Sequence, residues 1–156
     1  MENIEFSKEL IKGRVAETIF EQMFRESDKF TILKFGYENT VPELSQYQHL
    51  VEIKKVLDNI KNAPDFVLIS QDKKEVYLVE VKYRTKRNPI EIKEIAKEII
   101  KTWNPSHLFI ASPDGFFFSP CSYIIRGNGN ISPCLEKWVS KENQDKYLKL
   151  LNEFEE

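Results

Sequence analysis

Cysteine, glycine and proline are scarce in this chain of 156 residues, and long apolar runs are missing. Two cysteines are too few for a disulfide scaffold, and the spacing of Cys121 and Cys134 fits no common zinc site, so we expect buried or incidental thiols. Five glycines and seven prolines argue against a disordered chain or a fibrous repeat. No stretch approaches the roughly 20 apolar residues of a membrane-spanning helix, and the first residues do not form a secretory signal. We therefore expect a cytoplasmic protein that does not enter the membrane.

An overall positive charge is also missing. The chain has 23 Lys and Arg against 25 Asp and Glu, a formal net charge of −2, which excludes the basic field of proteins that bind polyanions indiscriminately. Positive charge is instead local, because residues 73–101 contain nine Lys or Arg and five Glu. Within that stretch Arg84, Lys86 and Arg87 follow one another with no acid between them, so they are candidate contacts to a DNA backbone. The alternative interpretation of these three residues is a solvent-exposed loop that does not contact DNA.

What the chain does contain is regular apolar periodicity in alternating segments. Apolar residues make up 41% of it, enough for one packed core, and the length fits one domain spanning residues 1–156. The spacing predicts helices over 8–27 with Ser7 as cap, 48–60, 89–103 with Asn88 as cap, and 141–154, and strands over 30–35, 65–69, 75–83, 107–111 and 116–125. This order favours an α/β fold with a mixed central sheet flanked by helices, in which the second helix is an insertion.

Three charged residues stand out on the expected hairpin. Asp65 begins its first strand directly after Pro64, and Glu80 and Lys82 are two apart on its second strand, where this spacing points both side chains to one face. The second strand is mostly apolar on both faces, so these charges need partners. Two carboxylates suit Mg²⁺, which proteins usually hold through one or two carboxylates with water completing the octahedron. A lysine beside them can orient an attacking water or offset charge on a phosphate.

The Glu-x-Lys spacing by itself carries little information. It also occurs at 52–54 and 91–93, both in segments with helical period, where residues two apart diverge around the axis. Only the copy that begins at Glu80 has strand context. Two plainer interpretations stay open: Asp65 can cap a turn, and Glu80 with Lys82 can be an ordinary ion pair on one face of the sheet.

A Pro-Asp pair ending at Asp65, followed after a short hairpin by Glu80-Val81-Lys82, resembles the motif of the PD-(D/E)XK nuclease superfamily. The core of that superfamily, in the order αβββαβ, resembles residues 8–112 here, with one inserted helix and a further C-terminal strand and helix. The resemblance implies a restriction-endonuclease-like fold. It also implies that Asp65 and Glu80 are metal ligands, that the main-chain carbonyl of Val81 is a further ligand, and that Lys82 is the catalytic lysine.

Many members of this superfamily also use a glutamate of the first helix. The segment 13–17, Gly-Arg-Val-Ala-Glu, looks like that element and has some likeness to Holliday-junction resolvases. Helical periodicity places Glu17 on the margin of the apolar stripe, which suits a group that leans into a site. The resemblance implies that Glu17 binds a second metal ion or a water on the metal.

The function that this resemblance implies is hydrolysis of phosphodiester bonds in DNA by an endonuclease that needs Mg²⁺, with Mn²⁺ able to substitute. Cutting both strands would take two copies, for which a symmetric homodimer is the usual arrangement. Other classes stay open. The chain can be a catalytically inactive nucleic-acid-binding or assembly module on the same fold, a nuclease subunit that acts only within a larger complex, or an enzyme that acts on nucleotides or RNA.

Overall fold

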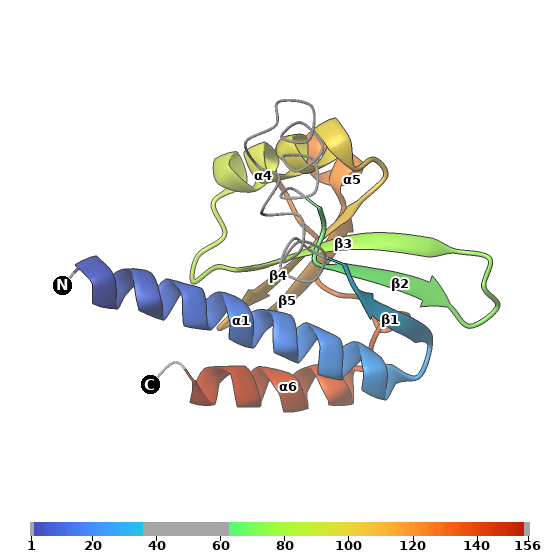
Figure 1. Ribbon diagram of the computed structural model, residues 1–156, viewed down its shortest axis with the longest axis horizontal. Coiled ribbons are helices and arrows are strands. Elements are labelled where there is room, and N and C mark those ends of the chain that lie inside the picture. The colour runs from blue at the N-terminus through green and yellow to red at the C-terminus, as the bar shows by residue number, and fades with distance from the viewer. Residues whose placement is uncertain (1, 36–62, 155–156) are drawn as a thin grey trace, which may run out of the picture.

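The computed structural model describes residues 2–35 and 63–154, which form a five-stranded mixed sheet with helices on both faces (Figure 1). The strands are β1 (Phe30–Lys34), β2 (Phe66–Ser70), β3 (Val76–Tyr83), β4 (His107–Ser112) and β5 (Gly115–Pro120). The helices are α1 (Glu2–Ser27), α4 (Pro89–Thr102), α5 (Cys121–Arg126) and α6 (Lys141–Glu153). The strands lie in the sheet in the order in which they follow one another in sequence.

Three of the four strand pairs are antiparallel, and one is parallel. β1 pairs antiparallel with β2, β2 with β3, and β4 with β5. The turn between β2 and β3 is closed by Asp72, whose Oδ1 accepts hydrogen bonds from Ser70 Oγ at 2.6 Å and from Lys74 N at 3.0 Å. β3 and β4 pair parallel, which requires a crossover, and α4 provides it.

The start of α4 is fixed by its own sequence. Asn88 Oδ1 accepts a hydrogen bond from Ile90 N at 2.9 Å, and Pro89 takes the first helical position, where its missing N–H has no partner to lose. The buried face of the helix then repeats at helical spacing through Ile92, Ala96 and Ile99. This crossover places the end of β3 and the start of α4 next to each other.

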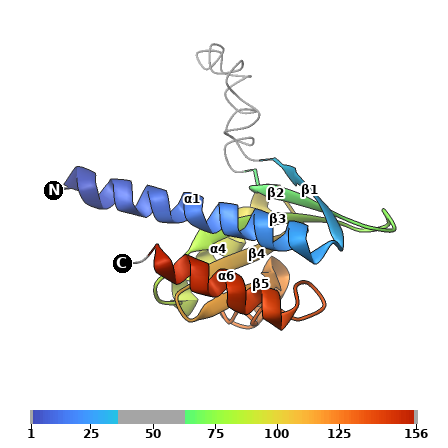
Figure 2. The same ribbon diagram turned by 90° about the horizontal axis from the view of Figure 1, so that it is seen from below.

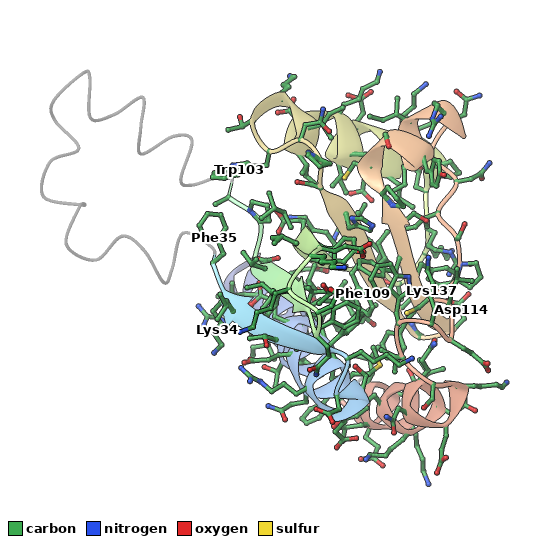
Figure 3. The ribbon with its side chains drawn as sticks, turned by 90° about the vertical axis from the view of Figure 1, so that its right-hand side faces the viewer. Lys34, Phe35, Trp103, Phe109, Asp114 and Lys137 are labelled. Atoms are coloured by element: carbon green, nitrogen blue, oxygen red, sulfur yellow. The ribbon has the colours of Figure 1, made fainter. Side chains whose placement is uncertain are left out.

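The helices form two layers around the sheet. α1 and α6 lie side by side on one face, and α4 and α5 cover the other (Figures 1 and 2). Strand alternation divides the core, so Val81 and Phe109 pack toward α1 whereas Leu108 and Ile110 pack toward α4. Phe109 lies inside the larger cluster (Figure 3), with its ring centroid 4.9 Å from that of Phe20.

Most of the expected elements are confirmed. β1, the hairpin of β2 and β3, α4 with its cap, β4 and α6 lie close to their expected bounds, and so does the α/β class with a mixed sheet flanked by helices. Cys121 and Cys134 are buried thiols, and burial raises the pKa of each to about 12. The helix expected over 48–60 lies outside the described residues. Of the helices that are described, none has the length and apolar character to cross a membrane.

The expected start of the first helix is wrong. α1 begins at Glu2, so Ser7 lies within the helix and does not cap it. The first turns of α1 extend beyond the edge of the sheet (Figure 2), and Ile4 in these turns is exposed. None of the core residues in the described part of the chain belongs to these turns, and the apolar period that marked the rest of the helix is missing there.

The strand expected over 116–125 is wrong in its second half. β5 ends at Pro120, and the next six residues form α5. Cys121 and Ile124 are buried three residues apart on this helix, against α4. An apolar run of this length is compatible with a strand or with a short helix, so periodicity did not separate the two.

Candidate active site

A pocket of about 250 Å³ opens beside the start of β2. One wall is the last part of β3 and a second is one face of α1, and Asp65 completes the lining. The pocket brings together all the residues for which the sequence suggested a role in catalysis or metal binding, namely Glu17, Asp65, Glu80, Val81 and Lys82. The three segments that carry them are far apart in sequence, so the fold creates this grouping.

Asp65 faces Glu80 because of how the ladder between β2 and β3 ends. The last paired residues are Phe66 and Val79, so the next position puts Asp65 opposite Glu80. Beyond this point the side chain of Asp65 replaces the backbone of β2, because its Oδ2 accepts a hydrogen bond from Val81 N at 2.8 Å. The carboxylate is thereby fixed at the open edge of β3.

The side chain of Asp65 is hydrogen-bonded to Glu80, and the pKa of its carboxyl is strongly raised. Burial of Asp65, together with the hydrogen bond and the negative charge of Glu80, raises the pKa of the Asp65 carboxyl to about 8. The hydrogen bond from Val81 and the positive charge of Lys82 oppose this shift without cancelling it. Two carboxylates that are crowded in this way are donors of the kind that hard divalent cations prefer.

Lys82 lies on the same face of β3 as Glu80, because side chains two apart on a strand share a face, and Arg84 directly follows the end of the strand. All three residues line the pocket. The Lys82 ammonium is close enough to Asp65 for its charge to act on the pKa of that carboxyl. The pocket therefore places a cation next to its two carboxylates.

The backbone of Val81 also faces the pocket side of β3. Its N–H donates to Asp65, and the N–H and C=O of one strand residue point to the same side of the strand. On the other side of β3, the parallel ladder with β4 uses the alternate residues, as in the hydrogen bond from Arg84 N to Ala111 O at 3.0 Å. We therefore expect the Val81 carbonyl to point to the open edge near Asp65.

The α1 wall carries three residues that the sequence did not mark as functional: Glu9, Leu10 and Arg14. Together with Gly13 and Glu17 they recur at helical spacings of three and four, so they share one face of the helix. Steps of three and four residues from Glu17 toward the N-terminus lead to Arg14, Leu10 and Glu9, so the sequence contained a signal for this face. Gly13 keeps the wall open, because none of the described atoms lies within 4 Å of the place its Cβ would take.

The donor atoms fit a Mg²⁺ ion that keeps several waters. Within residues 2–35 and 63–154, no group of three or more His, Cys, Asp or Glu side chains is spaced to hold a metal ion. The carboxylates that lie together in the pocket are Asp65 and Glu80, and Glu17 lines the same pocket from α1. One or two carboxylates with several waters is the arrangement that Mg²⁺ usually takes in proteins.

The three candidate DNA contacts do not form one strip. Arg84 lines the pocket, and its Nε lies 2.9 Å from Glu91 Oε1. Arg87 is not part of the pocket lining, and its Nη1 lies 2.7 Å from Oδ1 of Asp114, which is labelled in Figure 3. Lys86 is exposed. The structure separates them into a pocket arginine paired with Glu91, an arginine outside the pocket lining paired with Asp114, and an exposed lysine.

Comparison with the models of known protein families and with curated proteins finds no match for this chain. The functional argument therefore depends on the chemistry of the pocket itself.

Proposed function

We propose that this chain has a restriction-endonuclease-like core and is a DNA endonuclease that uses Mg²⁺, or Mn²⁺ in its place, to hydrolyse phosphodiester bonds. The observation that carries the proposal is the hydrogen-bonded pair of Asp65 and Glu80 at the open edge of β3, with Lys82 on the same strand face. Crowding two carboxylates in a largely buried place is unfavourable unless something compensates. A divalent cation compensates for both charges, and the pocket gives a phosphate access to it.

Asp65, Glu80 and the carbonyl of Val81 would hold the ion, with water in its other positions. When bound, Mg²⁺ supplies Lewis acidity toward a phosphate oxygen and lowers the pKa of an attacking water. Asp65 is held ready for this role because the Val81 N–H fixes one of its oxygens. Glu17 would reach the same region from α1, acting on surrounding waters or on a second ion.

Lys82 would act through its charge and its N–H donors. Its ammonium can orient the attacking water and offset the negative charge that grows on the phosphate in the transition state. Glutamine at this position keeps N–H donors and loses the charge. We therefore expect Lys82→Gln to lower kcat strongly while leaving metal binding close to that of the wild type.

A cleavage assay tests the proposal. Supercoiled, linear, branched and single-stranded DNA, and one RNA strand, are incubated with Mg²⁺, Mn²⁺ or EDTA. The wild type should cut at least one DNA with either metal and none in EDTA, and Asp65→Asn and Lys82→Ala should each lower the rate by roughly a thousandfold. Lys74→Ala is the matched control for Lys82, because Lys74 lies in the turn after β2 and does not line the pocket.

The pattern of cutting decides between the proposed function and its alternatives. DNA binding without any metal-dependent cutting would replace the proposal by a binding or assembly module. Cutting of RNA alone would change the substrate class. Plasmid linearisation that depends on protein concentration would indicate a homodimer that cuts both strands, whereas nicking that is independent of concentration would indicate a monomer.

A further inference from the structure

The pocket has a second charged part, made of two arginines on opposite walls. Arg84 directly follows the end of β3 and is four residues past Glu80, which is roughly 13 Å in an extended chain. Arg14 precedes Glu17 by almost one turn of α1. Each arginine is thus displaced from a carboxylate on its own wall.

Both displacements have the same direction. α1 and β3 run antiparallel along the pocket: Lys12 Nζ lies 5.5 Å from the ring centroid of Tyr83 at the end of β3, whereas Phe20, further along α1, packs on Phe66, which pairs with Val79 earlier in β3. Moving toward the N-terminus of α1 is therefore moving toward Arg84, and Arg14 lies on that side of Glu17. The two arginines consequently flank the same end of the pocket.

Arg84 is held in place before any ligand arrives. Its Nε is 2.9 Å from Glu91 Oε1, and its Nη1 donates to the Tyr83 carbonyl at 2.7 Å. A guanidinium has five N–H donors, so these two contacts leave three for a ligand. A side chain that is already fixed loses little conformational freedom on binding.

The two parts of the pocket suit different groups. Paired guanidinium groups suit phosphate, because each can donate two parallel hydrogen bonds to its oxygens. Next to Arg14, the α1 wall offers Leu10, which is 47% exposed, and the open space beside Gly13, and these can receive a sugar or a base. Glu9 adds a negative charge to the α1 wall on the N-terminal side of Arg14, so the positively charged part of the pocket does not extend further along α1.

We propose that Arg14 and Arg84 clamp the phosphate next to the one that is cut, so that the pocket selects a nucleic acid strand with consecutive phosphodiesters over mononucleotides and isolated phosphate esters. This inference rests on the proposed function, because Asp65 and Glu80 define where the cut phosphate lies. Both arginines are positioning residues that do not touch the reacting atoms. Loss of either one should therefore raise KM more than it lowers kcat.

DNA strands that carry one neutral methylphosphonate in place of a phosphate test the clamp. The neutral linkage is moved through the positions on each side of the cut, with cleavage followed in Mg²⁺ and binding followed separately by fluorescence anisotropy in Ca²⁺. In the wild type, one adjacent position should raise KM and Kd about tenfold. For Arg14→Gln and Arg84→Gln, KM and Kd should already be raised by this amount with the fully charged strand. The neutral linkage at that position should then raise them no further.

Arg25→Gln is the matched control, because Arg25 lies on α1, pairs with Glu21 at 2.8 Å and does not line the pocket. It should keep the wild-type response. Additive effects of mutation and neutral linkage, or equally fast cleavage of a mononucleotide ester, would overturn the clamp. If Arg84→Gln fails to fold, Arg84→Lys replaces it, and its Kd should lie between those of the wild type and Arg14→Gln.

The two proposals fail in different ways. In one outcome, the Kd values in Ca²⁺ show that mutation and neutral linkage are coupled, but no DNA is cut in Mg²⁺. This outcome would support the clamp and contradict the proposed hydrolysis. In the other outcome, the wild type cuts DNA and Asp65→Asn does not, but the arginine mutations and the neutral linkage have independent effects at every position. This outcome would support hydrolysis and contradict the clamp.

Discussion

The side chain of Asp65 is bonded to the backbone of the neighbouring strand, with Oδ2 accepting a hydrogen bond from Val81 N at 2.8 Å. The same carboxyl group also faces Glu80. Asp65 therefore has two roles, since it ends the ladder between β2 and β3 and it forms the carboxylate pair with Glu80. Asparagine has the same shape, can accept the bond from Val81 and can donate one to Glu80. Alanine can do neither.

We therefore predict that Asp65→Asn and Asp65→Ala both lower the rate of metal-dependent cleavage by roughly a thousandfold but differ in stability. In EDTA the free energy of unfolding should be about 1–2 kcal/mol higher for the asparagine variant, because alanine leaves the Val81 N–H without its acceptor. Urea unfolding followed by circular dichroism measures the difference. Equal free energies would mean that the cross-strand bond contributes nothing to the fold.

The raised pKa of Asp65 predicts how stability and metal binding depend on pH. The native carboxyl has a pKa of about 8 against an ordinary value of 3.8, so between these pH values the native protein keeps a proton that the unfolded chain has released. The contribution of this group to the free energy of unfolding must then fall as pH rises from about 4 to about 8. Mg²⁺ replaces the proton, so Mg²⁺ affinity should rise over the same range.

Calorimetry in two buffers of different ionisation enthalpy measures this proton directly. At pH 7 the binding of one Mg²⁺ should release close to one proton from the wild type. Glu17→Gln leaves Asp65 and Glu80 in place and should release the same number. Binding of Mg²⁺ at pH 7 without proton release would show that the ion does not displace the proton of Asp65.

Gly129 is predicted to be far less tolerant of a side chain than Gly13. A Cβ on Gly129 would lie 1.9 Å from Pro89 O, and the backbone φ there is +93°, a conformation that favours glycine. Gly129→Ala should therefore lower the free energy of unfolding by more than about 2 kcal/mol. Gly13→Ala, within α1 and next to open space, should raise it by roughly 0.5–1 kcal/mol. Thermal unfolding of both variants checks the contrast.

Two buried tyrosines are predicted to respond oppositely to loss of the hydroxyl group. Tyr83 and Tyr147 are 6% and 7% exposed, so they are closely matched in burial. Among the described residues the Tyr83 hydroxyl has no hydrogen-bond partner, whereas the Tyr147 hydroxyl donates to Glu26 Oε1 at 2.8 Å. Tyr83→Phe should leave stability unchanged or raise it by up to about 1 kcal/mol, and Tyr147→Phe should lower it by about 1–2 kcal/mol. Urea unfolding that moves both variants in the same direction would contradict this.

The parts of the fold that the sequence predicts are those with local physical causes. Asn88 and Pro89 fix the start of α4 through capping and backbone geometry, which need no distant partner. The meeting of Asp65 with Glu80 follows from a polar turn between two strands of period two, because a shift of one residue would put the apolar side chains on the wrong face. The candidate site could be found in the sequence for this reason.

The parts that the sequence misses depend on contacts across long separations. β5 gives way to α5 after Pro120, where Cys121 N donates to Ser106 O at 2.9 Å, and no local signal marks that contact. In the sequence, Arg14 is one of several charged residues on the first helix. Only the packing of α1 along β3 shows that Arg14 lines the pocket. The ion pair of Arg87 with Asp114 likewise joins residues that only the fold brings together.

Lys86 and Arg87 are adjacent in sequence but are predicted to contribute differently. The Arg87 guanidinium pairs with Asp114 and lies 3.7 Å from the ring centroid of Phe117, so Arg87→Ala should lower the free energy of unfolding by roughly 1 kcal/mol. Lys86 is exposed, and Lys86→Ala should leave stability unchanged. If Lys86 contacts a phosphate, its loss should reduce the slope of log affinity for DNA against log salt concentration by roughly one, because one fewer counterion is released on binding. DNA binding measured at several salt concentrations, beside urea unfolding of both variants, separates the two roles, and an unchanged salt slope for Lys86→Ala would remove Lys86 from the DNA contact surface.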